Sequence, residues 1–159
     1  MFFALTASQD AALVATQDDA GVRDLVGVLE DDWDWDWLCE VDKAWDAMHR
    51  CLGDGTLTLG RRNGTPLELV VLGGTHHYEG DDYVVARVDD GQVAELAAAL
   101  DEVSPEWLRE RYDAIDPDDY QGELTDDDFD YTWQYLLDVR EFYKTAAKSG
   151  RSVLFTVDQ

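Results

Sequence analysis

The last third of the chain contains a helical pattern that is long enough to set the dimensions of the whole fold. Over residues 126–149 apolar side chains recur every three or four positions, and Gly150 then interrupts the pattern; these side chains are Phe129, Trp133, Leu136, Leu137, Tyr143 and Ala147. This spacing places them on one face of an amphipathic helix. Such a helix would be about 36 Å long. It would cross a small domain from side to side, so the rest of the chain should pack along its apolar face.

Three segments predict β-strands, namely residues 1–7, 82–88 and 152–157, because β-branched and aromatic side chains are concentrated there. Between them, helical spacing and capping residues predict six or seven helices. No period of 20–50 residues repeats, and 159 residues fit one domain. We therefore expect an α+β fold, a predominantly helical single domain over residues 1–159 with a small sheet of about three strands.

The charge balance restricts the partners that the chain can bind. Lys and Arg total 12 against 36 Asp and Glu, which gives a net charge of −24. Nucleic acids and anionic membranes bind proteins whose Lys and Arg replace counterions, so we expect neither as a partner. A basic protein would instead be attracted. The alternative is that the acids serve only solubility or adaptation to salt.

The cysteines and the first residues predict a cytoplasmic protein. Cys39 and Cys51 are too few for a disulfide framework, and the apolar residues 1–7 are too short for a signal-peptide core or a membrane span. His76 and His77 are adjacent and predict an exposed loop, because the ligand spacing of a zinc site is missing. Residues 116–122 resemble a calcium loop, but the glycine comes at the seventh position instead of the sixth. We expect no metal and no cofactor.

Residues 31–37 alternate between aspartate and tryptophan. Strict alternation is typical of an extended segment, with Trp33, Trp35 and Trp37 on one side and the acids on the other. Two interpretations remain open. The indoles either pack over one edge of the core, or they form an exposed anchor for a basic partner, whose cations would lie against the rings.

The segment 42–52 has the spacing of a helix on which Asp42, Asp46 and His49 share one side. A carboxylate one turn from an imidazole can fix its tautomer and support general acid–base chemistry. His49, Asp46 and Arg87 are therefore the candidate catalytic residues, provided that the strand and the helix meet. The structural alternative is that Asp42 caps the helix and that His49 is a hydrogen-bonded, partly buried residue.

Several short motifs resemble the YfbM-like family of small bacterial proteins of unknown function. They are Asp42-Lys43, Trp45 and His49, then Leu72-Gly73-Gly74, Ala86-Arg87, and Phe142-Tyr143 in the last helix. The resemblance extends over nearly the whole chain and implies an α+β fold, with no known activity. Two departures are Val84-Val85, where the family has small residues, and the tryptophan run of residues 33–37.

The function we expect is that of a non-enzymatic, acidic binding protein of the bacterial cytoplasm. One form of it is an immunity-like protein that blocks a basic toxin such as a nuclease. The binding residues would be Asp42, Lys43, Trp45, Trp33, Trp35 and Trp37. The alternative is a hydrolase or transferase that uses His49 and Asp46, and a third hypothesis is a domain with a structural role only.

Overall fold

One antiparallel sheet organises the computed structural model, which describes residues 1–58, 65–78 and 80–158. The strands lie in the order β2-β1-β5-β4-β3. Their bounds are β1 Phe2–Leu5, β2 Leu38–Cys39, β3 Thr75–His76, β4 Tyr83–Val88 and β5 Ser152–Asp158. The first and last strands are neighbours in the middle of the sheet, and the two-residue strands β2 and β3 form its edges.

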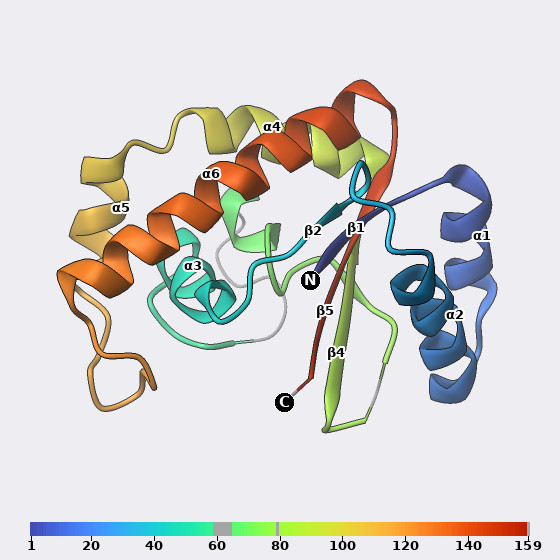
Figure 1. The fold of residues 1–159 in the computed structure, drawn as a ribbon, viewed down its shortest axis with the longest axis horizontal. Helices are drawn as coiled ribbons and strands as arrows, with labels where there is room; N and C mark the ends of the chain where they lie inside the picture. The colour runs from blue at the N-terminus through green and yellow to red at the C-terminus, as the bar shows by residue number, and fades with distance from the viewer. Residues whose placement is uncertain (59–64, 79, 159) are drawn as a thin grey trace.

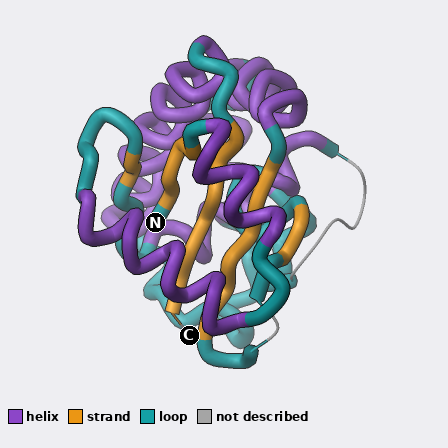
Figure 2. The backbone as a smooth tube through the Cα atoms, turned by 90° about the vertical axis from the view of Figure 1, so that its right-hand side faces the viewer, coloured by secondary structure: helices purple, strands orange, loops and turns teal. Residues whose placement is uncertain are grey.

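Helices cover both faces of this sheet (Figure 1). On one face lie α1 Ala7–Ala15 and α2 Asp19–Asp32, which cross the strands in Figure 2. The opposite face is covered by α3 Ala44–Leu52, α4 Asp90–Asp101, α5 Pro105–Tyr112 and α6 Asp126–Lys148, with a short 3₁₀ helix at Pro66–Leu69. The strands β1, β2, β4 and β5 therefore bury side chains on two sides.

The alternation of side chains along the strands separates two apolar clusters. In β1, Phe2 and Ala4 join the large cluster under α3–α6, whereas Phe3 and Leu5 join the smaller cluster under α1 and α2. Successive residues of a strand point to opposite faces, so a strand that is covered on both sides must be apolar throughout. This explains why the first residues of the chain form a continuous apolar run.

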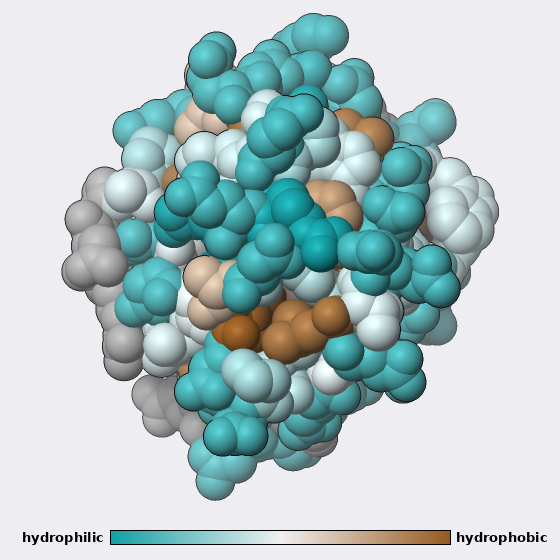
Figure 3. All heavy atoms as spheres, turned by 90° about the vertical axis from the view of Figure 1, so that its left-hand side faces the viewer, coloured by the Kyte–Doolittle hydropathy of each residue, from teal (hydrophilic) through white to brown (hydrophobic). Residues whose placement is uncertain are grey.

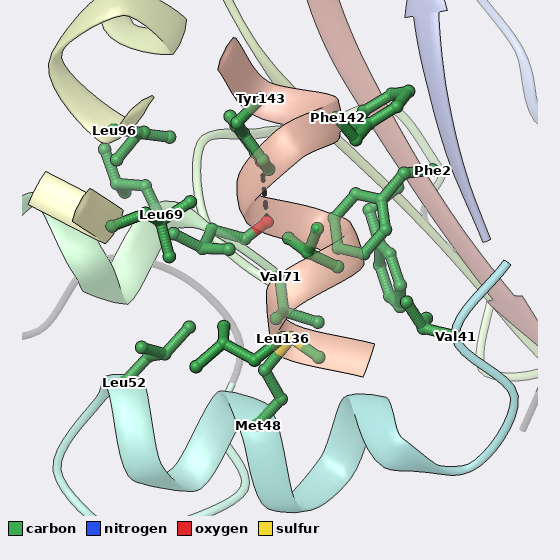
Figure 4. Close-up of a cluster of buried hydrophobic side chains, with 14 of the residues drawn as sticks. Phe2, Val41, Met48, Leu52, Leu69, Val71, Leu96, Leu136, Phe142 and Tyr143 are labelled. Atoms are coloured by element: carbon green, nitrogen blue, oxygen red, sulfur yellow. Dashed lines mark hydrogen bonds between the residues drawn. The ribbon is translucent and has the colours of Figure 1, made fainter. Parts of the chain in front are cut away.

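The large cluster is centred on α6, as the long apolar stripe predicts. Leu136 and Tyr143 of α6 join Met48 of α3 and Leu96 of α4 in this cluster, and Phe142 lies beside Phe2 of β1 (Figure 4). The Tyr143 hydroxyl is buried and donates a 2.7 Å hydrogen bond to the carbonyl of residue 70. A buried hydroxyl without a partner would destabilise the core, so this bond fixes the tyrosine and the 3₁₀ segment together.

The mixed α/β single domain is confirmed, but the expected count of about three strands is too low. All three predicted strands are present, and β2 and β3 are additional. A two-residue strand has too few positions to show a period, so neither could be detected from the sequence. His76 belongs to β3, and the backbone N–H of His77 donates to the carbonyl of Val85, so the predicted loop at these histidines is wrong.

The expected extended segment at residues 33–37 is also wrong. Helix α2 continues to Asp32, Trp33 takes the left-handed conformation with φ 41°, and a turn follows. Asp34 forms this turn, because its side chain accepts from the N–H of Asp36 at 3.1 Å and its carbonyl accepts from the N–H of Trp37 at 2.9 Å. Aspartate competes for its own backbone in this way, which favours a turn over a strand.

Candidate binding site

His49 is buried and is hydrogen-bonded to the backbone. Only 5% of it is exposed, and Nε2 lies 2.9 Å from the carbonyl oxygen of Thr58. That oxygen can only accept, so the ring nitrogen donates. Burial lowers the pKa of the imidazole, although the Thr58 contact opposes this. The neutral ring thus fastens the segment that follows α3 to the helix.

Asp46 is engaged with an arginine instead of the imidazole. Nε of Arg50 donates to its carboxylate at 2.6 Å. The two terminal nitrogens of the same guanidinium donate to Asp119. One bonds its carboxylate at 2.6 Å, and the other bonds its backbone carbonyl at 2.9 Å. Arg50 is 2% exposed. Arg50 is not among the site residues predicted from the sequence, although its position one turn after Asp46 is the spacing of a helical ion pair.

Arg87 lies on the other face of the sheet. Its guanidinium makes a two-point contact with Asp10 of α1, with N–O distances of 2.6 and 2.7 Å, and the Ser152 hydroxyl donates to the same carboxylate. These bonds hold the pKa of Asp10 below its usual value. Since Ala86 faces the cluster beneath α3, its neighbour Arg87 must face α1. The structure therefore does not bring Arg87 together with His49 and Asp46.

The residues before and at the start of α3 have different environments. Asp42 and Lys43 are exposed, and Asp42 has a positive φ of 39° and accepts a 2.8 Å hydrogen bond from the hydroxyl of Tyr131. Helix α3 begins after Lys43, whose side chain makes no capping bond, so the expected Asp42 cap is wrong. Trp45 is half-buried against the core, with its ring centroid 6.2 Å from that of Phe155. The helix is therefore amphipathic, as expected.

The three tryptophans of residues 33–37 divide into one packed and two exposed side chains. Trp37 packs on the large cluster, and the guanidinium of Arg151 lies 3.4 Å from its ring centroid. Trp33 and Trp35 are 37% and 67% exposed, and their rings meet edge to face at 5.5 Å. Packing over the core therefore describes Trp37, whereas Trp33 and Trp35 have the exposure that an anchor for a partner would need.

Trp35 borders a groove between β2 and α6, with a volume of about 450 Å³. We call it the β2–α6 groove. Its acidic lining residues are Asp36, Glu40, Asp138 and Glu141, and its other lining residues are Trp35, Leu38, Cys39, Tyr135, Phe142 and Thr145. Burial raises the pKa of Cys39 to about 12, so this thiol stays protonated. The groove combines aromatic and apolar surface with four carboxylates.

Positive charge near the surface is largely occupied by contacts inside the protein. Each of the seven arginines in the described ranges donates a hydrogen bond within the chain: Arg23, Arg50, Arg87, Arg109, Arg111, Arg140 and Arg151. Arg61 and Arg62 lie outside the described residues.

At the end of the molecule that carries α5 and the start of α6, hydrophilic residues surround a small apolar patch (Figure 3).

Two further properties bear on the kinds of site that the chain can offer. Among residues 1–58, 65–78 and 80–158, no three His, Cys, Asp or Glu side chains are grouped so that they could hold a metal ion. Within the same ranges, no helix is both long and apolar enough to cross a membrane.

Comparisons with known proteins agree with the resemblance noted in the sequence. The model of a family described as "Domain of unknown function (DUF1877)" matches residues 1–156. The crystal structure of YfbM from Escherichia coli, a protein of unknown function, is similar with a TM-score of 0.73 and 17% identity over 99% of this chain and 98% of that chain. At this identity the similarity shows the fold alone. No curated protein matches the chain.

Proposed function

We propose that this chain, which belongs to the DUF1877 family of unknown function, is a non-enzymatic binding protein of the bacterial cytoplasm with a basic protein as its partner. An immunity-like role, in which the acidic surface blocks a basic toxin, is one form of this function. The contact surface in this proposal consists of the exposed pair Trp33 and Trp35 and the adjoining β2–α6 groove.

The distribution of charge supports this proposal more than any other observation. The chain carries 36 acidic side chains against 12 basic ones, and the described arginines already donate to partners inside the protein. The field outside the molecule is therefore negative, and it accelerates encounters with positively charged proteins. Solubility alone would require acids but would not require exposed indoles beside them.

The exposed tryptophans add a short-range contribution to this long-range attraction. Trp35 is 67% exposed, and its ring lies edge to face against that of Trp33. Tryptophan is enriched among the residues that dominate binding energy at interfaces, and its ring attracts Lys and Arg cations. A basic partner could thus use both the charge and the rings.

The alternative of a hydrolase or transferase receives less support from the geometry. His49 donates to a backbone carbonyl, Asp46 contacts Arg50, and Arg87 contacts Asp10 on the opposite face of the sheet. Each of these residues already has a structural partner, and the three do not share a cavity. We therefore retain binding as the proposed function.

Affinity capture from a lysate of the source organism tests the proposal. The wild-type protein should retain a basic protein at about 0.05 M salt and release it at about 0.5 M, because salt screens exposed charges. The matched variant Trp33→Ser/Trp35→Ser has the same charge and should retain clearly less. The captured protein is identified, purified and bound again. If no basic protein survives this second step, the proposal is wrong.

A further inference from the structure

We infer that the basic partner presents an extended segment that pairs with the free edge of β2 and fills the β2–α6 groove. This inference rests on the proposed function and specifies its binding site and its mode of recognition. Strand addition to an exposed sheet edge is a known mode of peptide recognition, in which backbone hydrogen bonds supply affinity and side-chain pockets supply specificity.

The register of β2 shows which of its backbone groups are free. The N–H of Ala4 donates to the carbonyl of Trp37 at 2.8 Å, and Phe2 is opposite Cys39. In an antiparallel pair, every second residue bonds its neighbour and the residues between them point their N–H and C=O outward. The carbonyl of Trp37 and the backbone groups of Cys39 therefore face β1, and Leu38 directs both of its backbone groups away from the sheet.

In the described part of the chain no second strand pairs with this outward edge, although Leu38 and Cys39 are themselves largely buried. The pairing partner of β2 there is β1, and β2 is the terminal strand in the sheet order. Helix α6 lies beside β2 (Figure 1) and supplies the second wall of the groove. A polypeptide that entered the groove would thus meet a hydrogen-bonding edge on one side and a helix surface on the other.

The side chains around the edge select the charge of the incoming segment. Asp36 and Glu40 are on the β2 side of the groove, and Asp138 and Glu141 are on the α6 side; all four are exposed. Because a strand alternates its side chains, a segment with Lys or Arg at every second position would direct its cations to the carboxylates. Its other side chains would contact apolar lining residues such as Phe142.

Charge complementarity also decides between possible occupants. Many proteins protect their edge strands by keeping them short and by placing charges beside them, and β2 has both features. The charged residues that line the groove are all negative, and one of them, Glu141, also contacts Lys144 at 2.8 Å, so the groove repels another copy of this acidic chain and attracts a basic segment. Trp35, 67% exposed at the rim of the groove, provides an aromatic contact that protection of the edge does not require.

Calorimetry with synthetic peptides tests the inference. The probe is a seven-residue peptide that alternates Lys and Val, and its control has the same sequence with methyl groups on alternate backbone nitrogens. Methylation removes the donors of one peptide edge and keeps the charge. We expect methylation to weaken binding roughly tenfold, because strand addition depends on backbone hydrogen bonds. NMR should also show slower exchange of the Leu38 amide proton in the complex.

Two variants with equal charge locate the contact. Asp138→Asn/Glu141→Gln removes two carboxylates from the groove, whereas Asp127→Asn/Asp130→Asn removes two exposed carboxylates from the first half of the same helix. The groove variant should bind the unmodified peptide roughly tenfold more weakly than the wild type, and the control variant should bind within about twofold of the wild type.

The possible results separate the inference from the function on which it rests. If the methylated peptide binds as tightly as the unmodified one, or if both variants lose the same affinity, then strand addition at β2 is wrong and binding through the general acidic surface remains. If the unmodified peptide does not bind to the wild-type protein at low salt, while the partner captured from lysate does, then the extended-segment mode is wrong. If neither binds, the proposed function is also wrong.

Discussion

His49 has a perturbed environment that gives it a measurable role in stability. Burial lowers its pKa below 6.5, the ordinary value. As the pH falls, the unfolded chain takes up a proton near pH 6.5, whereas the folded protein takes it up only at a lower pH. The stabilising effect of the neutral ring is therefore present above that range, and it is lost as the pH decreases through 6.5 toward the folded-state pKa.

We predict that His49→Gln makes the free energy of unfolding less dependent on pH. Glutamine can donate to the Thr58 carbonyl but does not titrate, so the difference between the two proteins isolates this one group. Urea denaturation between about pH 7.5 and pH 5.5 should show a steeper loss for the wild type. If the free energy of unfolding changed with pH equally in the two proteins, the assignment of a buried neutral imidazole would be wrong.

The structure explains why one of the motifs that carry the family resemblance has a glycine at position 74. The φ of Gly74 is +87°, and a Cβ atom at this position would lie 2.1 Å from the carbonyl oxygen of Arg87. Both the backbone conformation and the close approach of β4 exclude a side chain. The Leu72-Gly73-Gly74 sequence is therefore a requirement of packing, and it does not indicate a ligand site.

Alanine substitutions at two glycines should have opposite effects. Gly74→Ala should lower the free energy of unfolding by about 3 kcal/mol, because both backbone strain and a clash are introduced. Gly27→Ala, on α2 with nothing within 4 Å of its Cβ position, should raise it by about 0.5–1 kcal/mol through helix propensity. Chemical denaturation measures both. A neutral result at Gly74 would contradict the described turn.

At the scale of elements, Arg50 connects α3 to the segment that joins α5 and α6. Its contact to Asp119 spans 69 residues of sequence, whereas Asp46 lies four residues before it on the same helix. A guanidinium that is 2% exposed requires such partners, because a buried charge without them is strongly destabilising. The acidic segment near Asp119, which resembled a calcium loop in the sequence, is thus held by an arginine.

Removal of this side chain should loosen the segment around residue 119. Arg50→Ala should lower the free energy of unfolding by about 3 kcal/mol, because Asp46 is left partly buried without a counterion. Arg109→Ala is the matched control, since Arg109 also contacts two aspartates but at the surface, and it should have little effect. Equal losses in urea denaturation would show that burial is not the decisive factor.

Substitutions of the tryptophans in the turn at residues 33–37 should separate effects on stability from effects on binding. Trp37→Ala should cost about 2–3 kcal/mol of unfolding free energy, because the indole packs on the large cluster and under Arg151. Trp35→Ala should change it by less than about 0.5 kcal/mol, because the ring is mostly exposed. Thermal denaturation compares the two. A large loss for Trp35→Ala would mean that this ring serves the core.

The length of a helix or strand decides whether it can be predicted from the sequence pattern. The α6 stripe and the three longer strands have enough residues for a period to appear, and the structure contains all of them. The face on which Arg87 lies could not be predicted, because β4 is apolar on both sides and its alternation does not identify the helix that covers each side. The groove depends on a two-residue strand beside α6, and such a strand leaves no pattern.

At the scale of the whole molecule, the fold determines where the excess of negative charge lies. The sheet places the chain's buried arginines among specific acids, and the remaining carboxylates form the outer surface. Four of these carboxylates, those of Asp36, Glu40, Asp138 and Glu141, line the β2–α6 groove. The central claim is that this surface binds a basic partner, and that it does not serve solubility alone.

The most direct test is the affinity for the alternating Lys and Val peptide as a function of salt, measured by calorimetry on the wild-type protein and the two charge-matched variants. We predict binding at about 0.05 M salt that weakens roughly tenfold or more by about 0.3 M, in the wild type and the Asp127→Asn/Asp130→Asn control. The Asp138→Asn/Glu141→Gln variant should already be weak at low salt. If the wild-type protein releases no measurable heat at low salt and its amide signals do not shift, the acids do not serve binding to a basic segment.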